Sequence, residues 1–307
     1  MKIIFLLSIL TSSIIAKTSK CHSCFMGVCY QRTKIFGGTE ATSTGENTYQ
    51  ITGQLAVDRN KENNILYFHY VKNNVDHTGA YDLNNDIAYA IANISFSFAR
   101  AVASNGDLYM SGPKGIYKYI AGSNTTVLHG LKDSTIWHMQ YKDKLYYNIH
   151  SEPGLNVLEK KGSPISSLKS YMIEDFVIDK YGDIYFLANT TIYRLKHDSK
   201  EVEDLVDQIY LLTTDRNGNV YFAHTATSGI YKIDYSIDRI VSVGAFGGNG
   251  GTPLKFVFDN LNNVVYLDED QALYFLRPTY RGCKVSSNLT GKRRMLSVYA
   301  TDVWVAS

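Results

Sequence analysis

The sequence predicts an all-β fold, a six-bladed β-propeller, from three observations. An apolar run that ends at a polar turn and restarts with an apolar residue and a tyrosine occurs six times. The copies lie about 40 residues apart, which is the period of a propeller blade. The composition favours strands, with 24 tyrosines against 2 tryptophans and only 5 prolines. The tyrosines shared by the copies are Tyr67, Tyr109, Tyr146, Tyr185, Tyr221 and Tyr266.

Residues 1–16 are expected to be a secretory signal peptide. Lys2 supplies the positive start, an apolar stretch continues to Ile15, and Ala16 suits cleavage. The stretch is too short to span a bilayer, and no later segment approaches about 20 uninterrupted apolar residues. We therefore expect a secreted, extracellular monomer without a membrane anchor. Residues 17–283 would form the propeller and residues 284–307 a C-terminal tail.

Residues 175–206 show the four strands expected of each blade. An inner strand at 175–179 meets a polar turn, and returning strands follow at 184–188, 191–196 and 202–206. Their mixed apolar and aromatic residues are typical of strands buried on both faces. The same pattern predicts strands at 100–103, 108–111, 116–120 and 126–128, and again at 210–214, 220–224, 230–234 and 240–243.

The hairpin turns within the blades contain glycine next to acidic residues. Gly106, Gly182 and Gly218 allow the positive φ that a tight turn needs. The segment 215–219 also resembles the start of a calcium-binding EF-hand loop. The match fails because Val220 and Ala226 stand where that loop requires glycine and glutamate. We therefore expect turns and no metal site.

The last blade runs out of sequence before its fourth strand. Strands are expected at 255–259, 264–268 and 272–277, and Cys283 then follows. Residues 28–36 alternate between apolar and polar and are expected to supply the missing strand. Pairing the N-terminal strand with the last blade would close the ring and remove both exposed sheet edges. Residues 296–305 also alternate, and they would either cover the last blade or stay loose.

The four cysteines lie at the two ends of the expected propeller. In an exported protein they predict two disulfides, for which three pairings are possible. We expect Cys283 to bond Cys24 or Cys29 across the seam of the ring. A zinc site at Cys21, Cys24 and Cys29 is the weaker alternative, because no second ligand pair lies at matching spacing.

Asparagine sequons agree with export. Each could accept a glycan in a eukaryotic secretory pathway. The sequons begin at Asn93, Asn124, Asn189 and Asn288.

The charge balance argues against two classes of partner. A formal net charge of +2 with both signs interspersed argues against nucleic acid and against a polybasic contact with membranes. The basic run at 292–294 falls in the expected tail and reads as a solvated or processed terminus.

A ligand site is expected at the propeller mouth, where inner strands begin and second strands end. There Trp137 and Tyr210 would stack a flat ring, and Arg100 and Lys255 would pair with a carboxylate. The alternative is structural, with Trp137 wedged between blades and the histidines hydrogen-bonded to loops. The candidate ligand-binding residues are His69, Arg100, Trp137, His138, His150, Tyr210, His224 and Lys255.

The sequence contains no motif that resembles a hydrolase site. There is no G-x-S-x-G elbow, no H-E-x-x-H motif and no isolated cysteine. The glycine-rich run at 244–251 lacks the lysine and helix of a nucleotide loop, so it is expected to be a flexible lip or a linker. A calcium-dependent lactonase would leave only scattered acids. Asp175, Asp268 and Glu269 are candidates for such acids, but the accompanying cations suit an organic anion better.

The sequence resembles the insect ommochrome-binding proteins, secreted haemolymph proteins of moths and butterflies. The resemblance covers about residues 21–283, including CHSCFMGVCYQRTKIF, LAVDRNKENNILYFHY, VIDKYGDIYF and TDRNGNVYFAHTATSGIYKID. It implies a carrier of a tryptophan-derived phenoxazinone pigment or its precursor. Receptor-type propellers share similar phrases, but this sequence lacks their Tyr-Trp-Thr-Asp repeats and their cysteine module.

These observations together predict a secreted glycoprotein that binds a small aromatic metabolite without a cofactor and without catalysis. A calcium-dependent lactonase or esterase of the six-bladed type is the first alternative. An extracellular propeller that binds other proteins is the second.

Overall fold

The computed structural model describes residues 21–42, 45–60, 62–94, 96–131, 133–158, 163–225, 228–246 and 253–283. The expected signal peptide, the C-terminal tail with Asn288, and most of the glycine-rich run lie outside these residues. Apart from two short 3-10 turns, Ala121–Ser123 and Ser166–Leu168, the regular elements are β-strands. In this described part of the chain, no helix has the length and apolar character needed to cross a membrane.

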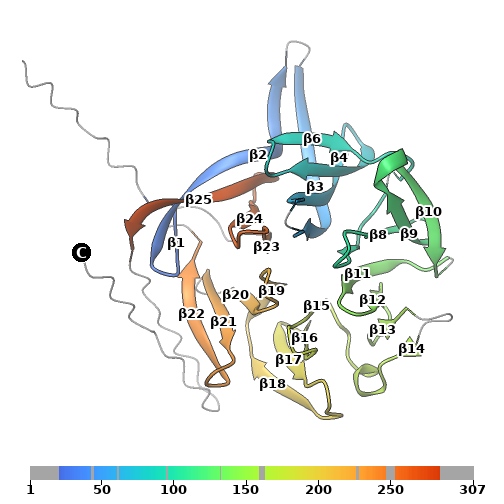
Figure 1. The fold of residues 1–307 in the computed structure, drawn as a ribbon, viewed down its shortest axis with the longest axis vertical. Coiled ribbons are helices and arrows are strands. Elements are labelled where there is room, and N and C mark those ends of the chain that lie inside the picture. Colours follow the sequence, from blue (N-terminus) through green and yellow to red (C-terminus); the bar gives the residue numbers. More distant parts are fainter. Residues whose placement is uncertain are drawn as a thin grey trace, which may run out of the picture.

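The strands form successive antiparallel sheets placed around a common centre (Figure 1). Consecutive strands pair within each sheet, so that each sheet is a meander. The first sheet contains β3 (Gly45–Asp58), β4 (Ile65–Lys72), β5 (Val75–Asp82) and β6 (Ile87–Ala90). The next contains β7 (Arg100–Val102), β8 (Leu108–Gly112), β9 (Gly115–Ile120) and β10 (Thr125–Gly130).

The remaining sheets continue the same order around the ring. One contains β11 (Ile136–Tyr141), β12 (Leu145–Ile149), β13 (Asn156–Val157) and β14 (Ser163–Pro164). The following one contains β15 (Asp175–Ile178), β16 (Ile184–Ala188), β17 (Thr191–Leu195) and β18 (Val202–Val206). Next come β19 (Ile209–Thr214), β20 (Val220–His224), β21 (Gly229–Asp234) and β22 (Arg239–Ala245), and finally β23 (Lys255–Phe258), β24 (Val264–Leu267) and β25 (Ala272–Gly282).

The first strand of each sheet lies at the centre of the ring. Contacts join β3 to β7, β7 to β11, β11 to β15, β15 to β19, β19 to β23, and β23 back to β3. The expected inner strands at 100–103, 175–179, 210–214 and 255–259 correspond to β7, β15, β19 and β23. The all-β, propeller-like arrangement predicted from the repeats is therefore confirmed.

The N-terminal strand joins the last sheet, as expected. Strand β2 (Val28–Thr42) pairs antiparallel with β25, with Thr33 opposite Phe275. Its far end pairs with β3, where Gly38 lies opposite Tyr49, so β2 links the last sheet to the first. A short strand, β1 (Ser23–Phe25), pairs both with β2 and with β22, a contact that the sequence pattern did not predict.

Two disulfides fix this seam. Cys24 bonds Cys283 over a sequence separation of 259 residues, and Cys21 bonds Cys29 over 8 residues. The expected bridge across the seam is confirmed, and its N-terminal partner is Cys24. All four cysteines are used in these bonds, so the alternative zinc site is wrong.

The repeated tyrosines help to fill the core between neighbouring sheets. Tyr185 and Tyr221 are almost fully buried, with exposed fractions of 0% and 2%. Tyr185 belongs to a cluster with Ile209 and Phe222 of the next sheet. Alternating side chains from adjacent sheets interdigitate in this way, which explains why the phrase recurs once per sheet.

The acidic turns are held by their own hydrogen bonds. The Oδ1 atom of Asp215 accepts hydrogen bonds from the backbone N–H groups of Asn217 and Asn219, each at 2.9 Å. Its Oδ2 accepts one from Asn219 Nδ2 at 2.8 Å. Asp179 and Asp259 hold their turns with the same backbone pattern. The segment 215–219 is thus a turn, as expected, and its carboxylate oxygens serve the turn.

Candidate ligand-binding site

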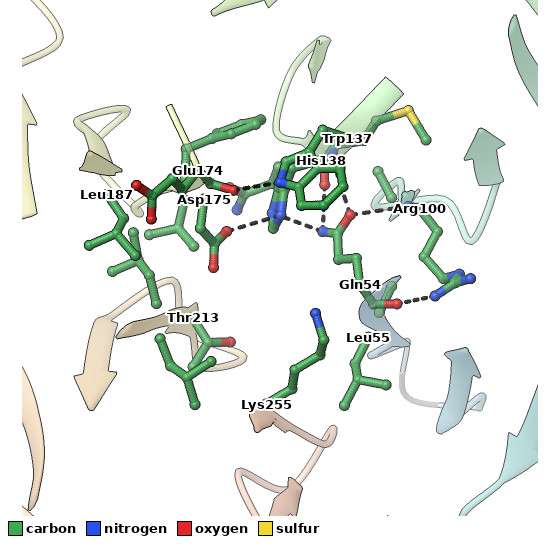
Figure 2. A pocket seen from close by; sticks show the side chains of 18 of the residues that line it. Gln54, Leu55, Arg100, Trp137, His138, Glu174, Asp175, Leu187, Thr213 and Lys255 are labelled. Atoms are coloured by element: carbon green, nitrogen blue, oxygen red, sulfur yellow. Dashed lines mark hydrogen bonds and ion pairs between the residues drawn. The ribbon is translucent and has the colours of Figure 1, made fainter. Parts of the chain in front are cut away.

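A cavity of about 600 Å³ lies inside the ring of inner strands. Its size falls within the range of small-molecule sites. Side chains from every inner strand reach it, and Figure 2 shows several of them converging from different sheets. The lining includes residues 54–57, 98, 100–102, 137–141, 149–152, 172–177, 210–214 and 254–257, together with Arg59 and Leu187.

Most of the predicted site residues meet at this cavity. They are Arg100, Trp137, His138, His150, Tyr210 and Lys255. His69 and His224, on the second strands β4 and β20, do not belong to the lining, and both are buried away from it. His69 is buried with Nδ1 2.6 Å from Thr52 Oγ1 and Nε2 3.1 Å from Asp76 Oδ1. His224 is buried, with its ring 6.3 Å from that of Tyr231.

An aromatic wall forms one side of the mouth. The ring of Trp137 stacks on Phe98, with centroids 4.4 Å apart and planes inclined by 26°. The His150 ring lies 4.7 Å from the same indole. Trp137 Nε1 donates a hydrogen bond to the Glu174 carbonyl at 3.1 Å, which fixes the orientation of the indole. Phe98 lies in the segment between β6 and β7, outside any predicted strand, so no sequence pattern pointed to it.

Arg100 braces the wall of the cavity. Its side chain is completely buried, and its guanidinium donates to the carbonyls of Gln54 and Ser97. Within the described part of the chain, its Nε has no hydrogen-bond partner. Burial lowers the pKa of Arg100 to about 9. The guanidinium N–H groups that form hydrogen bonds donate to backbone carbonyls. Arg100 therefore contributes positive charge to the site and does not offer a ligand the paired N–H donors of a guanidinium.

Gln54 joins three inner strands, and it was expected at the start of an inner strand but not among the candidate site residues. Its Oε1 accepts hydrogen bonds from the backbone N–H groups of Arg100 and Met139, at 3.1 and 3.2 Å. Its Nε2 donates to the Met139 carbonyl at 2.7 Å and lies 3.0 Å from His138 Nε2. Because the amide orientation is set by the backbone contacts, Nε2 must donate to His138.

The tautomer of His138 follows from this contact. If Nε2 accepts from Gln54, the proton of the neutral imidazole resides on Nδ1. That nitrogen lies 3.0 Å from Asp175 Oδ1. Figure 2 shows the resulting chain from Gln54 through His138 to Asp175 along the upper wall of the cavity. Asp175, at the start of β15, is therefore the acidic partner that this ring nitrogen faces.

Lys255 extends from the start of β23 into the cavity. Figure 2 shows its ammonium group near the centre, without a hydrogen bond or ion pair to the other residues drawn. Burial lowers the pKa of Lys255; nearby Asp175 opposes this effect and Arg100 adds to it. Tyr210 lines the cavity from the neighbouring strand β19. Its hydroxyl is buried without a hydrogen-bond partner among the described residues, and burial raises its pKa.

Arg59 lines the cavity from the end of β3. It follows β3 and donates to the carbonyls of Phe258, Asp215 and Thr214 at 3.1, 2.8 and 2.7 Å. These contacts tie the first sheet to the two last ones. Burial lowers the pKa of Arg59 to about 10, while Asp215 and Asp259 oppose this effect. In the sequence Arg59 resembles an ordinary turn residue, so no pattern indicated that it would line the cavity.

The electrostatics of the cavity favour an anion. Arg59, Arg100 and Lys255 line it, and Asp175 is the acidic side chain closest to its centre in Figure 2. Glu152 and Glu174 lie at the exposed rim. Among the described residues, no group of three or more His, Cys, Asp or Glu side chains is placed to hold a metal ion. The cavity therefore combines aromatic surface with buried positive charge, which suits an aromatic organic anion.

Comparison with known proteins supports the resemblance seen in the sequence. No family model matches the chain. The chain is 24% identical over 229 residues to the ommochrome-binding protein of Manduca sexta, covering 71% of this chain and 80% of that protein. The expected similarity to the lepidopteran ommochrome-binding proteins is thus confirmed.

Solved structures with a similar fold include binding proteins and enzymes. An auxiliary nutrient-binding protein from Bacteroides ovatus matches with a TM-score of 0.59 and 12% identity, over 82% of this chain and 77% of that one. A gluconolactonase from Xanthomonas campestris matches with a TM-score of 0.57 and 10% identity, over 83% and 91%. The virginiamycin B lyase from Staphylococcus aureus gives 0.51 and 10%, over 80% and 98%. At these identities the matches show a shared fold alone.

Proposed function

We propose that this chain is a six-bladed propeller that carries a small aromatic anion, of the ommochrome type, non-covalently in its central cavity. The observation that carries the proposal is the ammonium of Lys255, which has no ion-pair partner among the described residues and lies inside a cavity of about 600 Å³. The aromatic wall of Phe98, Trp137 and His150 lies in the same cavity. Similarity to an ommochrome-binding protein favours a pigment as the ligand.

The two parts of the site would contribute in different ways. An aromatic ring placed on the wall gains about 25 cal/mol for each Å² of apolar surface removed from water. A carboxylate at Lys255 adds a charge-assisted hydrogen bond, worth roughly 1.5–3 kcal/mol. A difference of 1.4 kcal/mol corresponds to a tenfold change in affinity, so the charge-assisted hydrogen bond would favour ligands with a carboxylate by at least tenfold. We expect burial of the ring to supply most of the remaining affinity.

Export fits the same proposal. Two disulfides are typical of proteins from oxidising compartments. Asn93, Asn124 and Asn189 are exposed and remain candidates for glycans. We therefore propose a secreted, glycosylated monomer that acts in an extracellular fluid such as haemolymph.

The lactonase alternative is weaker on the chemistry of the lining. A calcium site needs several oxygen ligands that converge, usually from carboxylates. Here Asp175 is engaged by His138, and cations line the same cavity. The alternative of a protein-binding propeller is weaker for a different reason, because the polar and charged groups converge inside the ring.

Titration with xanthommatin tests the carrier function. We expect a shift in the visible spectrum of the pigment and quenching of Trp137 fluorescence. The titration should use a Trp304→Phe background, so that Trp137 is the one emitting tryptophan. Absence of both signals would contradict the proposal. Hydrolysis of a lactone that stops on adding a chelator would instead support the enzyme.

A further inference from the structure

Asp175 and Lys255 present opposite charges to one cavity without pairing with each other. Figure 2 shows both side chains directed toward the open centre, from β15 and β23, with no contact drawn between them. Asp175 is instead held by His138, with Oδ1 3.0 Å from Nδ1. The charge of Asp175 raises the pKa of Lys255 and so opposes the lowering by burial, in line with their shared place at the cavity.

Because Asp175 and Lys255 face the same cavity without pairing with each other, the site suits a ligand that carries both charges. A ligand with only a carboxylate at Lys255 would place its negative charge in the field of Asp175. A ligand with only an ammonium group at Asp175 would meet the positive field of Lys255 and Arg100. A zwitterionic head group places a charge of the right sign at each side chain, and desolvated opposite charges attract strongly in such a site.

We infer that the cavity recognises an α-amino acid head group attached to an aromatic ring. The ligand ammonium would lie at Asp175, its carboxylate at Lys255, and its ring against Phe98 and Trp137. The inference rests on the proposed carrier function and refines it, because the ligand would carry an ammonium group in addition to the carboxylate proposed for Lys255. Asp175 and Lys255 are then the residues that determine specificity.

The chain from Gln54 to Asp175 gives this arrangement its rigidity. Gln54 fixes the Nδ1–H tautomer of His138, and that N–H faces one oxygen of Asp175. The other oxygen, Oδ2, has no partner drawn in Figure 2 and is the one available to a ligand. A carboxylate oriented in advance loses less conformational entropy when it binds an ammonium group.

Three indole compounds separate the two charges experimentally. L-tryptophan carries both charged groups, indole-3-propionate carries the carboxylate, and tryptamine carries the amine. We expect calorimetry at neutral pH to show L-tryptophan binding at least about tenfold more tightly than either of the others, corresponding to one added charge-assisted hydrogen bond. Equal or weaker binding of L-tryptophan, or its failure to bind where xanthommatin binds, would overturn the inference and leave the carrier function standing.

Two variants assign each charge to its residue. Asp175→Asn should weaken L-tryptophan and tryptamine about tenfold or more and leave indole-3-propionate unchanged or tighter. Lys255→Met should weaken L-tryptophan and indole-3-propionate and leave tryptamine unchanged or tighter. The exposed residues Asp143 and Lys114 provide the matched controls Asp143→Asn and Lys114→Met. A uniform loss for all three compounds would indicate a structural role and refute the assignment.

Failure of xanthommatin and all three compounds to bind the unmodified protein would refute the carrier function itself.

Discussion

The Gln54 amide nitrogen lies 3.0 Å from Nε2 of His138. The two residues are 84 positions apart in the sequence and belong to the inner strands of different sheets. This contact sets which nitrogen of His138 faces Asp175. The same amide satisfies backbone groups of Arg100 and Met139, so one side chain on β3 organises β7, β11 and the start of β15. The architecture of the ring and the geometry of the site therefore depend on a shared residue.

Replacement of Gln54 should destabilise the fold. Gln54→Ala leaves the backbone N–H groups of Arg100 and Met139 and the carbonyl of Met139 without their partner. Each unsatisfied buried group costs about 1–3 kcal/mol, and water in the cavity can compensate in part, so we expect a loss of about 2–4 kcal/mol. Urea denaturation measures the effect, with Gln50→Ala on the exposed side of the same strand as the control. Equal stability of both variants would contradict the bridging role.

Gly53, next to Gln54, should not tolerate a side chain. Its φ is +70°, and an added Cβ would lie 2.4 Å from the carbonyl oxygen of Phe98. Gly27 has a similar φ of +75° but open space around the corresponding position. We expect Gly27→Ala to cost about 1 kcal/mol from backbone strain alone. Gly53→Ala should cost about 2–4 kcal/mol because overpacking is added. Thermal unfolding followed by circular dichroism separates the two, and similar melting temperatures would argue against the close contact with Phe98.

The two disulfides should contribute unequally to stability. The chain-entropy model gives about 5.5 kcal/mol for a loop as long as that closed by Cys24 and Cys283, and about 2.5 kcal/mol for the short loop of Cys21 and Cys29. The double variant Cys24→Ser/Cys283→Ser should therefore lose more than Cys21→Ser/Cys29→Ser. Removing both cysteines of a pair avoids a free thiol that could form new bonds. Guanidinium denaturation compares the variants, and a larger loss from the short loop would contradict the expectation.

Repetition made the scaffold predictable. Each sheet can be recognised from a local alternation of apolar and polar residues, and the incomplete last sheet indicated that β2 would pair with β25. Because Cys283 follows the last expected strand, beside that seam, its disulfide partner could be predicted as either Cys24 or Cys29. These features depend on residues close in the sequence, or on the need to cover exposed sheet edges.

The site was less predictable because its contacts join residues that are distant in the sequence. Nothing local distinguishes Gln54 or Arg59 from exposed strand and turn residues, yet both bridge several sheets. His69 was expected at the mouth because it lies near the end of a second strand. Its side chain is instead buried within its own sheet, where it contacts Thr52 and Asp76 of the flanking strands. Inner-strand residues such as Trp137 and Lys255 were found because their position alone places them at the cavity.

His69 should make the fold sensitive to mild acid. Burial lowers its pKa below the usual value of 6.5, so the unfolded chain takes up a proton before the folded protein does. Stability therefore falls as the pH drops below 6.5, and the decline ends once the pH passes the lowered pKa. The slope for this residue is at most about 1.4 kcal/mol per pH unit. Urea denaturation between pH 7 and pH 5 should show a shallower slope for His69→Gln than for the unmodified chain. The exposed His197→Gln should keep the original slope, and an unchanged slope for His69→Gln would contradict the prediction.

Binding of a carboxylate should weaken at alkaline pH through Lys255. Burial lowers the pKa of Lys255 below 10.5, with Arg100 adding to the effect and Asp175 opposing it. Above this pKa the amine is neutral and cannot pair with the ligand. A bound carboxylate favours the protonated form, so binding takes up a proton and affinity falls by up to tenfold per pH unit, starting below pH 10.5. Tyr210, whose pKa is raised by burial, should stay protonated through this range.

Indole-3-propionate is the appropriate probe for this titration, since it has no amine of its own to lose a proton. Calorimetry from pH 7 to pH 10 should show its affinity decline for the unmodified protein and for Lys114→Met. Lys255→Met should bind it weakly at every pH and lose most of this decline, keeping only the part that comes from Arg100, because burial lowers the pKa of Arg100 to about 9. Circular dichroism at each pH confirms that the ring stays folded. If Lys255→Met retained the full decline, another group would control the binding of the anion, and the assignment of the ligand carboxylate to Lys255 would be wrong.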